Sequence, residues 1–282
     1  MNGSDIMENI NNTSKVESEN IDEIEMFNCQ LMDLYIKQKY YDNAKIVAEK
    51  YPNNEKIQYK LIIICIETKR FKEGIEIAKK YPDNDLIQSQ LVTLYIKTGR
   101  YEKGIEIAKR FPDCEILQSQ LINIYIKQNN YKEAEKEAKK YPDNEVIQSQ
   151  LITIYIKTRK YKKGIDVAGR FSNSKSILSQ LITIYIKVGR YDKAFKIAEY
   201  NSDYEPIQNQ LINLYMRMGR FDEAEKEIQK HIDYEPNQSL LMTIYLEQKR
   251  YIEAIKIGES NPDNEIMQYK LMIAYINVGE YE

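Results

Sequence analysis

The sequence repeats itself every thirty residues from about Ile21 to Glu282, without an insertion or a deletion. Leucine recurs at one repeat position and tyrosine four residues later, as at Leu91 and Tyr95. A fixed period of this size indicates that one small supersecondary unit is stacked many times. The period therefore predicts a solenoid, although the length of 282 residues would normally favour two globular domains.

Each repeat unit contains two amphipathic helical segments. In the unit from Asp83 to Phe111, apolar residues such as Leu91 and Tyr95 recur every three or four positions and predict a first helix. Gly99 follows it and favours a left-handed helix end. The second segment places small residues such as Gly104 on its apolar face, which lets two helices approach closely. Each unit is therefore predicted to be an antiparallel helix pair that cannot bury its apolar face alone.

The period sets the expected fold class and domain organisation. We predict an all-α solenoid of about eight antiparallel helix pairs plus a terminal capping helix. A disordered acidic tail is expected at residues 1–20, because that segment is too polar to form a core. The solenoid should span residues 21–282, with pairs at about 24–51, 54–81, 84–111, 114–141, 144–171, 174–200, 204–231 and 234–260, and a terminal helix at 264–280.

The amino-acid composition limits the expected binding partners and the expected cellular compartment. The formal net charge of −2 gives no general attraction to nucleic acid or to an anionic membrane. No apolar run approaches the roughly 20 residues of a membrane span, and no secretory signal is expected. Cys29, Cys65 and Cys114 are odd in number and irregular in spacing, so neither a disulfide framework nor a zinc site is predicted. A reducing, cytoplasmic compartment is the expected location.

Residues that could support catalysis are scarce. His231 is the sole histidine, which argues against catalysis by histidine and against sites with several histidine ligands. It occupies a repeat position that is aromatic in earlier units, so we expect a structural role. The tyrosine stripe at the Tyr95 position is likewise expected to be core. We predict that the chain is not an enzyme and uses no cofactor and no metal.

The stretch from Tyr95 to Ile105, YIKTGRYEKGI, resembles the helix–turn–helix of the tetratricopeptide repeat (TPR) family. Leu91 and Tyr95 match its first-helix positions, whereas Gln88 stands at its tryptophan position. The family unit has about 34 residues, so this one is shorter by about one helical turn. The resemblance implies a right-handed superhelix whose concave groove binds partners, and hence a protein-interaction module.

One side of each first helix is expected to line that groove. With Leu91 at the core and about 100° per residue, Ser89, Thr93 and Lys97 fall on the opposite side. The same three positions recur along the chain. The predicted partner-binding residues are Ser89, Thr93, Lys97, Ser119, Asn123, Lys127, Ser149, Thr153, Lys157, Ser179, Thr183, Lys187, Asn209, Asn213 and Arg217.

The lysine position supplies one positive charge per repeat, between Glu67 and Glu247. One interpretation is a row of cations for an acidic protein or peptide partner, flanked by Gln90 and its equivalents. The other is a solvated polar face that duplication has repeated, since charge runs often only solvate a surface. No membrane partner is predicted, and a second copy of the chain, making a structural homo-oligomerisation scaffold, is an alternative.

A second resemblance concerns the short class of pentatricopeptide repeats, in runs such as Leu181 to Gly189. It implies single-stranded RNA binding, with one base read per repeat. The first base-reading position corresponds to Ser89 and its equivalents, which suits that code. The second corresponds to Cys114, Asn144, Ser174 and Tyr204, which mostly does not. RNA is therefore the alternative partner.

Overall fold

The structure is a computed structural model, and it describes residues 24–230 and 235–279. The predicted tail at residues 1–20 and the predicted structural role of His231 lie outside the described residues. All the regular structure in the described ranges is helical, without a strand. None of the helices described is long and apolar enough to cross a membrane.

The helices alternate between two types along the chain. A typical first helix has 13 residues, and the second helices are shorter, with 8 to 10 residues. The first helices are residues 24–37, α3 (Glu55–Glu67), α5 (Asp85–Lys97), α7 (Glu115–Lys127), α9 (Glu145–Lys157), α11 (Lys175–Lys187), α13 (Glu205–Arg217), α15 (Glu235–Glu247) and α17 (Glu265–Val278). The second helices are α2 (Tyr41–Lys50), α4 (Phe71–Ala78), α6 (Tyr101–Arg110), α8 (Tyr131–Ala138), α10 (Tyr161–Ala168), α12 (Tyr191–Tyr200), α14 (Phe221–Gln229) and α16 (Tyr251–Glu259).

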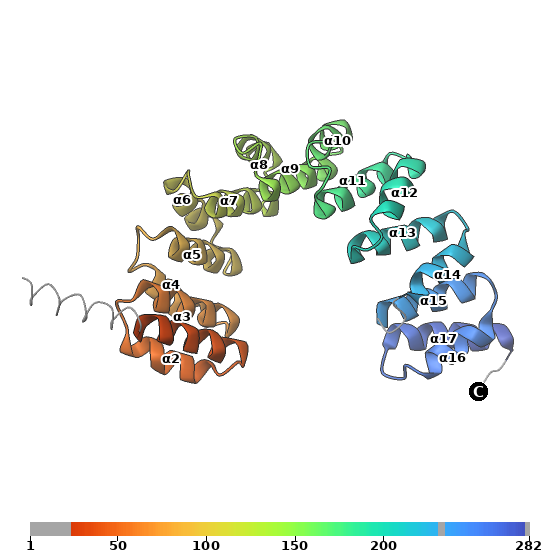
Figure 1. The fold of residues 1–282 in the computed structure, drawn as a ribbon, viewed down its shortest axis with the longest axis horizontal. Helices are drawn as coiled ribbons and strands as arrows, with labels where there is room; N and C mark the ends of the chain where they lie inside the picture. Colours follow the sequence, from red (N-terminus) through yellow and green to blue (C-terminus); the bar gives the residue numbers. More distant parts are fainter. Residues whose placement is uncertain (1–23, 231–234, 280–282) are drawn as a thin grey trace, which may run out of the picture. The chain divides into compact units, whose positions relative to one another are not determined.

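The chain divides into two compact units, Met1–Pro142 and Asp143–Glu282. In each unit, consecutive helices pack side by side (Figure 1). Neighbouring first helices also contact one another: α3 with α5 and α5 with α7 in the first unit, and α9 with α11 and α11 with α13 in the second. Inside a unit, a second helix that lies between two first helices contacts both of them, as α6 contacts α5 and α7. The first helices therefore form a layer from α3 to α7 in the first unit and from α9 to α13 in the second, and the second helices cover its other side.

Helix ends follow the polar and glycine signals of the sequence. Asn84 caps α5, because its side-chain oxygen accepts a hydrogen bond from the backbone N–H of Ile87 at 2.9 Å. Gly99 ends the same helix with a φ of +70°, as predicted. Lys69, Asn129 and Arg159 adopt the same left-handed conformation at the equivalent position, where a side chain is less favourable than glycine.

The core lies between the two helix types. Leu91 and Tyr95 are 3% and 4% exposed, so the predicted tyrosine stripe is core at this position and at its equivalents from Tyr125 to Tyr245. A Cβ atom on Gly104 would lie 2.9 Å from Cδ1 of Ile124 on the next first helix. The small residue therefore allows the close helix approach that the sequence predicts.

A buried glutamine explains how the short second helix ends. Gln88 is 2% exposed, and its Nε2 donates to the carbonyl oxygens of Ala78 at 3.1 Å and Tyr81 at 2.8 Å. The last carbonyls of a helix have no partner within the helix, so the amide satisfies them. The same pair of bonds, which we call the glutamine clamp, is made by Gln58, Gln118 and Gln268. The residue at the TPR tryptophan position is thus a polar cap for the preceding helix.

Candidate partner-binding face

The predicted partner-binding residues lie on five first helices, on one face of each. We call the solvent side of the first-helix layer the first-helix face. In the first unit it carries the predicted residues of α5 and α7, and in the second unit those of α9, α11 and α13. Within one helix the three positions share a face because they are four residues apart. They are nevertheless used in different ways.

The serine and threonine positions are joined to the next helix by glutamine. Nε2 of Gln120 on α7 donates to the carbonyl oxygen of Ser89 and to Oγ1 of Thr93 on α5, both at 3.0 Å. Gln180 makes the same two bonds from α11 to α9, and Gln210 makes them from α13 to α11. We call these bonds the glutamine ladder. It fastens neighbouring first helices along the floor of the face.

The ladder changes the role of several predicted residues. Ser89 is only 2% exposed, and its hydroxyl donates to the carbonyl oxygen of Leu86 at 2.7 Å. Direct contact of Ser89 with a partner, as predicted from the sequence, is therefore blocked by burial. Thr93, Thr153 and Thr183 are half-buried, and each donates its hydroxyl to the carbonyl four residues earlier. These hydroxyls hold the floor together.

The lysine position remains open to solvent. Lys97, Lys127, Lys157, Lys187 and Arg217 are all exposed, each at the last residue of its helix. None of the five makes an ion pair with a residue in 24–230 or 235–279. Other lysines do so across repeats, for example Lys45 with Glu73 at 3.3 Å. At the border of the row, Glu67 accepts a bond from the hydroxyl of Tyr41, which raises the pKa of Tyr41.

An exposed apolar position on the same face was not predicted. Leu86 and Ile116 are 50% and 51% exposed although they are large aliphatic residues, and Val146 and Ile266 occupy the equivalent position with 63% and 64% exposure. Each is the second residue of its helix. The available signal was the pair of adjacent apolar residues at each helix start, since only one of Leu86 and Ile87 can face the core.

Two cavities open on the first-helix face where the ladder is interrupted. In the first unit, a cavity of about 480 Å³ lies among Cys29, Tyr59, Lys60, Leu86 and Ile87. In the second unit, a cavity of about 480 Å³ lies between α13, α15 and the start of α17, where Leu240 replaces the ladder glutamine. It is lined by Asn209, Asn213, Pro236, Ser239, Leu240, Asn264 and Ile266.

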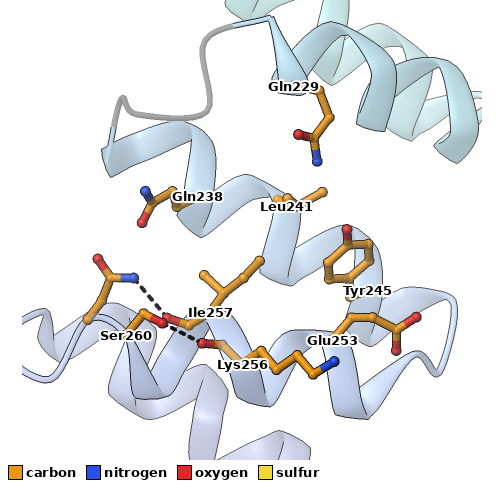
Figure 2. A pocket seen from close by; sticks show the side chains of 9 residues that line it. Gln229, Gln238, Leu241, Tyr245, Glu253, Lys256, Ile257 and Ser260 are labelled. Atoms are coloured by element: carbon orange, nitrogen blue, oxygen red, sulfur yellow. Dashed lines mark hydrogen bonds between the residues drawn. The ribbon is translucent and has the colours of Figure 1, made fainter.

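A third cavity, of about 430 Å³, lies between α14, α15 and α16 (Figure 2). Figure 2 shows Gln229 and Gln238 on one side of it and Lys256, Ile257 and Ser260 on the other. Ser260 donates its hydroxyl to the carbonyl of Lys256 at 2.8 Å. Gln238 occupies the clamp position, and among the described residues it makes no bond to the carbonyl of Ile228, the equivalent of Ala78. The cavity is therefore a loosely filled seam between helices.

No chemistry-bearing cluster stands out in the part of the chain that the structure describes. No group of three or more His, Cys, Asp or Glu residues there is placed to hold a metal ion. The described cysteines are free. Burial raises the pKa of the Cys65 thiol to about 11, so this group is a poor nucleophile at neutral pH.

Comparison with known proteins identifies the fold. The family model for the PPR repeat matches residues 209–226. No curated protein matches the sequence. Yeast Tom70 is similar in structure with a TM-score of 0.62 and 18% identity, covering 86% of this chain and 58% of that chain. A human IFIT1 dimer with m7Gppp-AAAA has a TM-score of 0.56 and 14% identity, covering 89% of this chain and 70% of that chain.

A tetratricopeptide repeat protein from Parabacteroides merdae is also similar, with a TM-score of 0.46 and 15% identity, covering 88% of this chain and 97% of that chain. Identities this low show the fold alone. The chain is a TPR-like, all-α helical-repeat solenoid with a local resemblance to pentatricopeptide repeats, as its period predicted.

Proposed function

We propose that this TPR-like solenoid is a non-enzymatic adaptor that holds an acidic peptide segment or protein surface on its first-helix face. The proposal rests on the row of exposed cations at the lysine position, which are Lys97 and Lys127 in the first unit and Lys157, Lys187 and Arg217 in the second. Packed helices lie about 8–10 Å apart, which is close to the screening length at physiological salt. Neighbouring cations in such a row repel one another, and an anionic partner relieves that repulsion.

The glutamine ladder also supports this proposal, because it fixes the positions of the helices that carry the cations. A floor fastened by Gln120, Gln180 and Gln210 keeps the spacing of the helices fixed before a partner arrives. Preorganisation of this kind lowers the entropic cost of association. The remaining predicted positions, Ser119, Asn123, Ser149, Ser179, Asn209 and Asn213, are then partly floor and partly polar contact. Asn213 is exposed beside the cavity between α13 and α15.

A charge-reversal experiment tests the proposal. The variant Lys127→Glu/Lys157→Glu/Lys187→Glu should lose at least tenfold in affinity for a labelled oligoglutamate peptide, and should lose captured partners from cell extract. The matched control is Lys132→Glu/Lys162→Glu/Lys196→Glu, which changes the same charge on exposed lysines of the second helices. Equal affinity of both variants for the peptide would show that the first-helix face is not the binding surface.

Single-stranded RNA is the second candidate, because the PPR match covers residues 209–226. Two of the four side chains at the second base-reading position are already engaged, which weighs against base reading. Oδ1 of Asn144 accepts from the N–H of Ile147, and the hydroxyl of Ser174 caps α11 and donates to Glu145. RNA binding predicts that affinity for a homopolymer RNA falls steeply between about 50 and 200 mM salt. An adaptor for protein predicts no measurable RNA affinity.

A homo-oligomerisation scaffold and a cytoplasmic location stay predictions. Sedimentation over a range of protein concentrations and salt tests the first. A single monomeric species throughout would remove it. Fractionation of the source cell tests the second.

A further inference from the structure

The first-helix face of the first unit has two chemically different edges. Leu86 and Ile116 form an apolar edge at the start of α5 and α7, and both are about half exposed. Lys97 and Lys127 form a cationic edge at the end of the same helices. Each apolar residue precedes its lysine by eleven positions. Eleven residues advance an α-helix by about 16 Å and return to within about 20° of the same face. The two edges therefore run in parallel across α5 and α7.

The surface between the two edges offers few free hydrogen-bonding groups to the main chain of a bound peptide. The carbonyl oxygen of Ser89 and the hydroxyl of Thr93 accept from Gln120, and the hydroxyl of Ser89 is used within α5. An extended peptide is usually recognised through its own N–H and C=O groups, which need free partners on the receiving surface. A helix satisfies those groups internally and presents only side chains. The floor thus favours a helical partner.

The dimensions also suit a helix. An α-helix with side chains is about 10–12 Å across, which fills the space between edges about 16 Å apart and leaves room for lysine side chains to reach it. Packed helices such as α5 and α7 lie about 8–10 Å apart, and seven residues of a partner helix advance about 10.5 Å. One acidic residue in every seven therefore meets one lysine in every repeat.

From these observations we infer that the partner segment is an amphipathic α-helix with an acidic stripe and an apolar stripe, lying across α5 and α7. Its acidic residues, at i and i+7, face Lys127 and Lys97. Its apolar residues, at i+1, i+5 and i+8, lie about 80–140° further round the helix and face Leu86 and Ile116. The cavity beside Leu86 and Ile87 receives an apolar side chain from the end of this stripe. The inference rests on the proposed function and specifies its partner.

Three designed peptides test the helix. The probe is an alanine-rich peptide of roughly 20 residues, long enough to be helical, with glutamates and leucines at the positions given above. One control has the same composition in scrambled order, and the other carries two prolines on the outward side, which break the helix. Fluorescence anisotropy with the full chain should give an affinity for the probe at least tenfold higher than for either control. Affinities within twofold of one another would overturn the helix.

Two protein variants test the apolar edge. Leu86→Ser/Ile116→Ser should weaken probe binding about tenfold with the melting temperature unchanged, because both side chains are exposed. The matched control is Ile46→Ser/Ile252→Ser, which removes equally exposed aliphatic residues from second helices and should bind as the wild type does. Wild-type affinity in Leu86→Ser/Ile116→Ser would overturn the inference.

One result separates this inference from the proposed function. If all three peptides bind alike and all lose affinity in Lys97→Glu/Lys127→Glu, the partner is acidic but not helical, and only the inference fails. If neither the probe nor oligoglutamate binds, both fail.

Discussion

We call the junction between one first helix and the next a step. The steps from α9 to α13 and the step from α13 to α15 bury similar apolar residues, but they differ in the polar contacts that join the two helices. Gln180 and Gln210 tie α11 to α9 and α13 to α11. At the next step Leu240 takes the ladder position, and a cavity of about 480 Å³ lies there. The interruption is local, because Lys270 on α17 again donates to the carbonyl and hydroxyl oxygens of Ser239 on α15.

The clamp varies more along the second unit than the ladder does, because Leu178 stands at its position on α11 and Gln208 on α13 donates instead to the carbonyl of Glu227 at 3.4 Å. Gln118 and Gln268 clamp the ends of α6 and α16, whereas Gln238 borders the cavity between α14, α15 and α16. A charged network stands nearby: Arg250 pairs with Glu225 at 2.7 Å, and the hydroxyl of Tyr245 donates to the same carboxylate at 2.8 Å. The network links α15 and its following turn to α14 without a glutamine.

Burial of apolar side chains holds the helices in the stack, and polar contacts determine how firmly each first helix is joined to the next. Met242 and Ile244 on α15 are as fully buried as Ile212 and Leu214 on α13. The helix is therefore in place although Leu240 cannot form the ladder bonds and Gln238 makes no clamp bond to the described end of α14. In a repeat array each unit contacts only its neighbours, so local differences in fastening give local differences in stability. We expect the α13–α15 step to open more readily than the steps before it.

The largest expected effect is the loss of a glutamine clamp. Gln118→Ala removes two buried hydrogen bonds and leaves the carbonyls of Ala108 and Phe111 with only their backbone donors, the N–H groups of Phe111 and Cys114, which should cost about 2–3 kcal/mol in the free energy of unfolding. Gln238→Ala is the matched change at the interrupted step, and it should cost less than about 0.5 kcal/mol. Urea titrations of both variants measure the difference. Equal losses in the two variants would show that the clamp of Gln118 contributes no more stability than Gln238 does.

Much of this molecule could be predicted from its sequence because the period repeats each signal many times. The positions of Leu91 and Tyr95 predict the core, and Gly99 predicts the helix end. The exposure of Lys97 follows from its angle to Leu91 on the helix. These features depend on one helix or one helix pair, for which 100° per residue and the nature of the side chain are sufficient.

The polar contacts between repeats could not be predicted in this way. Gln90 and its equivalents looked like groove residues because they lie beside the serines in the helical projection. Whether Gln120 reaches the carbonyl of Ser89 depends on the distance and offset between α5 and α7, which the pattern of one helix does not contain. The same holds for Gln88, whose partners are backbone carbonyls of the preceding unit and carry no sequence signal.

The next effect concerns the network at the interrupted step. Burial, followed by the hydrogen bond to Glu225, raises the pKa of Tyr245 to about 12. A phenol in the unfolded chain releases its proton near pH 10, so the folded state holds this proton more tightly. The resulting stabilisation is complete below about pH 10 and is lost as the pH rises from about 10 to 12, with an upper limit of about 3 kcal/mol.

Chemical denaturation at pH 9 and pH 11.5 measures this loss. Other tyrosines also titrate in that range, so the relevant quantity is the difference between the wild type and Tyr245→Phe, which lacks the ionisable hydroxyl. The variant should lose less stability between the two pH values. An identical pH dependence of the two proteins would mean that the network does not fasten α15 to α14.

A smaller effect is expected from removing one step of the ladder. Gln180→Ala loses the bonds to the carbonyl of Ser149 and the hydroxyl of Thr153, but it also removes a buried side-chain oxygen that has no hydrogen-bond partner in the described structure. The two effects partly cancel, so we expect a cost of about 1 kcal/mol. Hydrogen exchange should show faster opening of α9 and α11. Unchanged exchange there would show that the ladder adds no stability.

The smallest effect comes from rebuilding the missing step. Leu240→Gln places an amide at the ladder position of α15. The carbonyl oxygen of Asn209 and the side chain of Asn213 on α13 occupy the positions of the ladder acceptors. Two new hydrogen bonds should outweigh the loss of a half-buried leucine by about 0.5 kcal/mol. Leu240→Ala is the control, because it removes the same apolar contact without adding a donor, and it should be less stable than the wild type. If the melting temperatures of the glutamine and alanine variants coincide, the new amide does not reach its acceptors. The offset between α13 and α15 then differs from that of the regular steps, and this offset, not the leucine at position 240, interrupts the ladder.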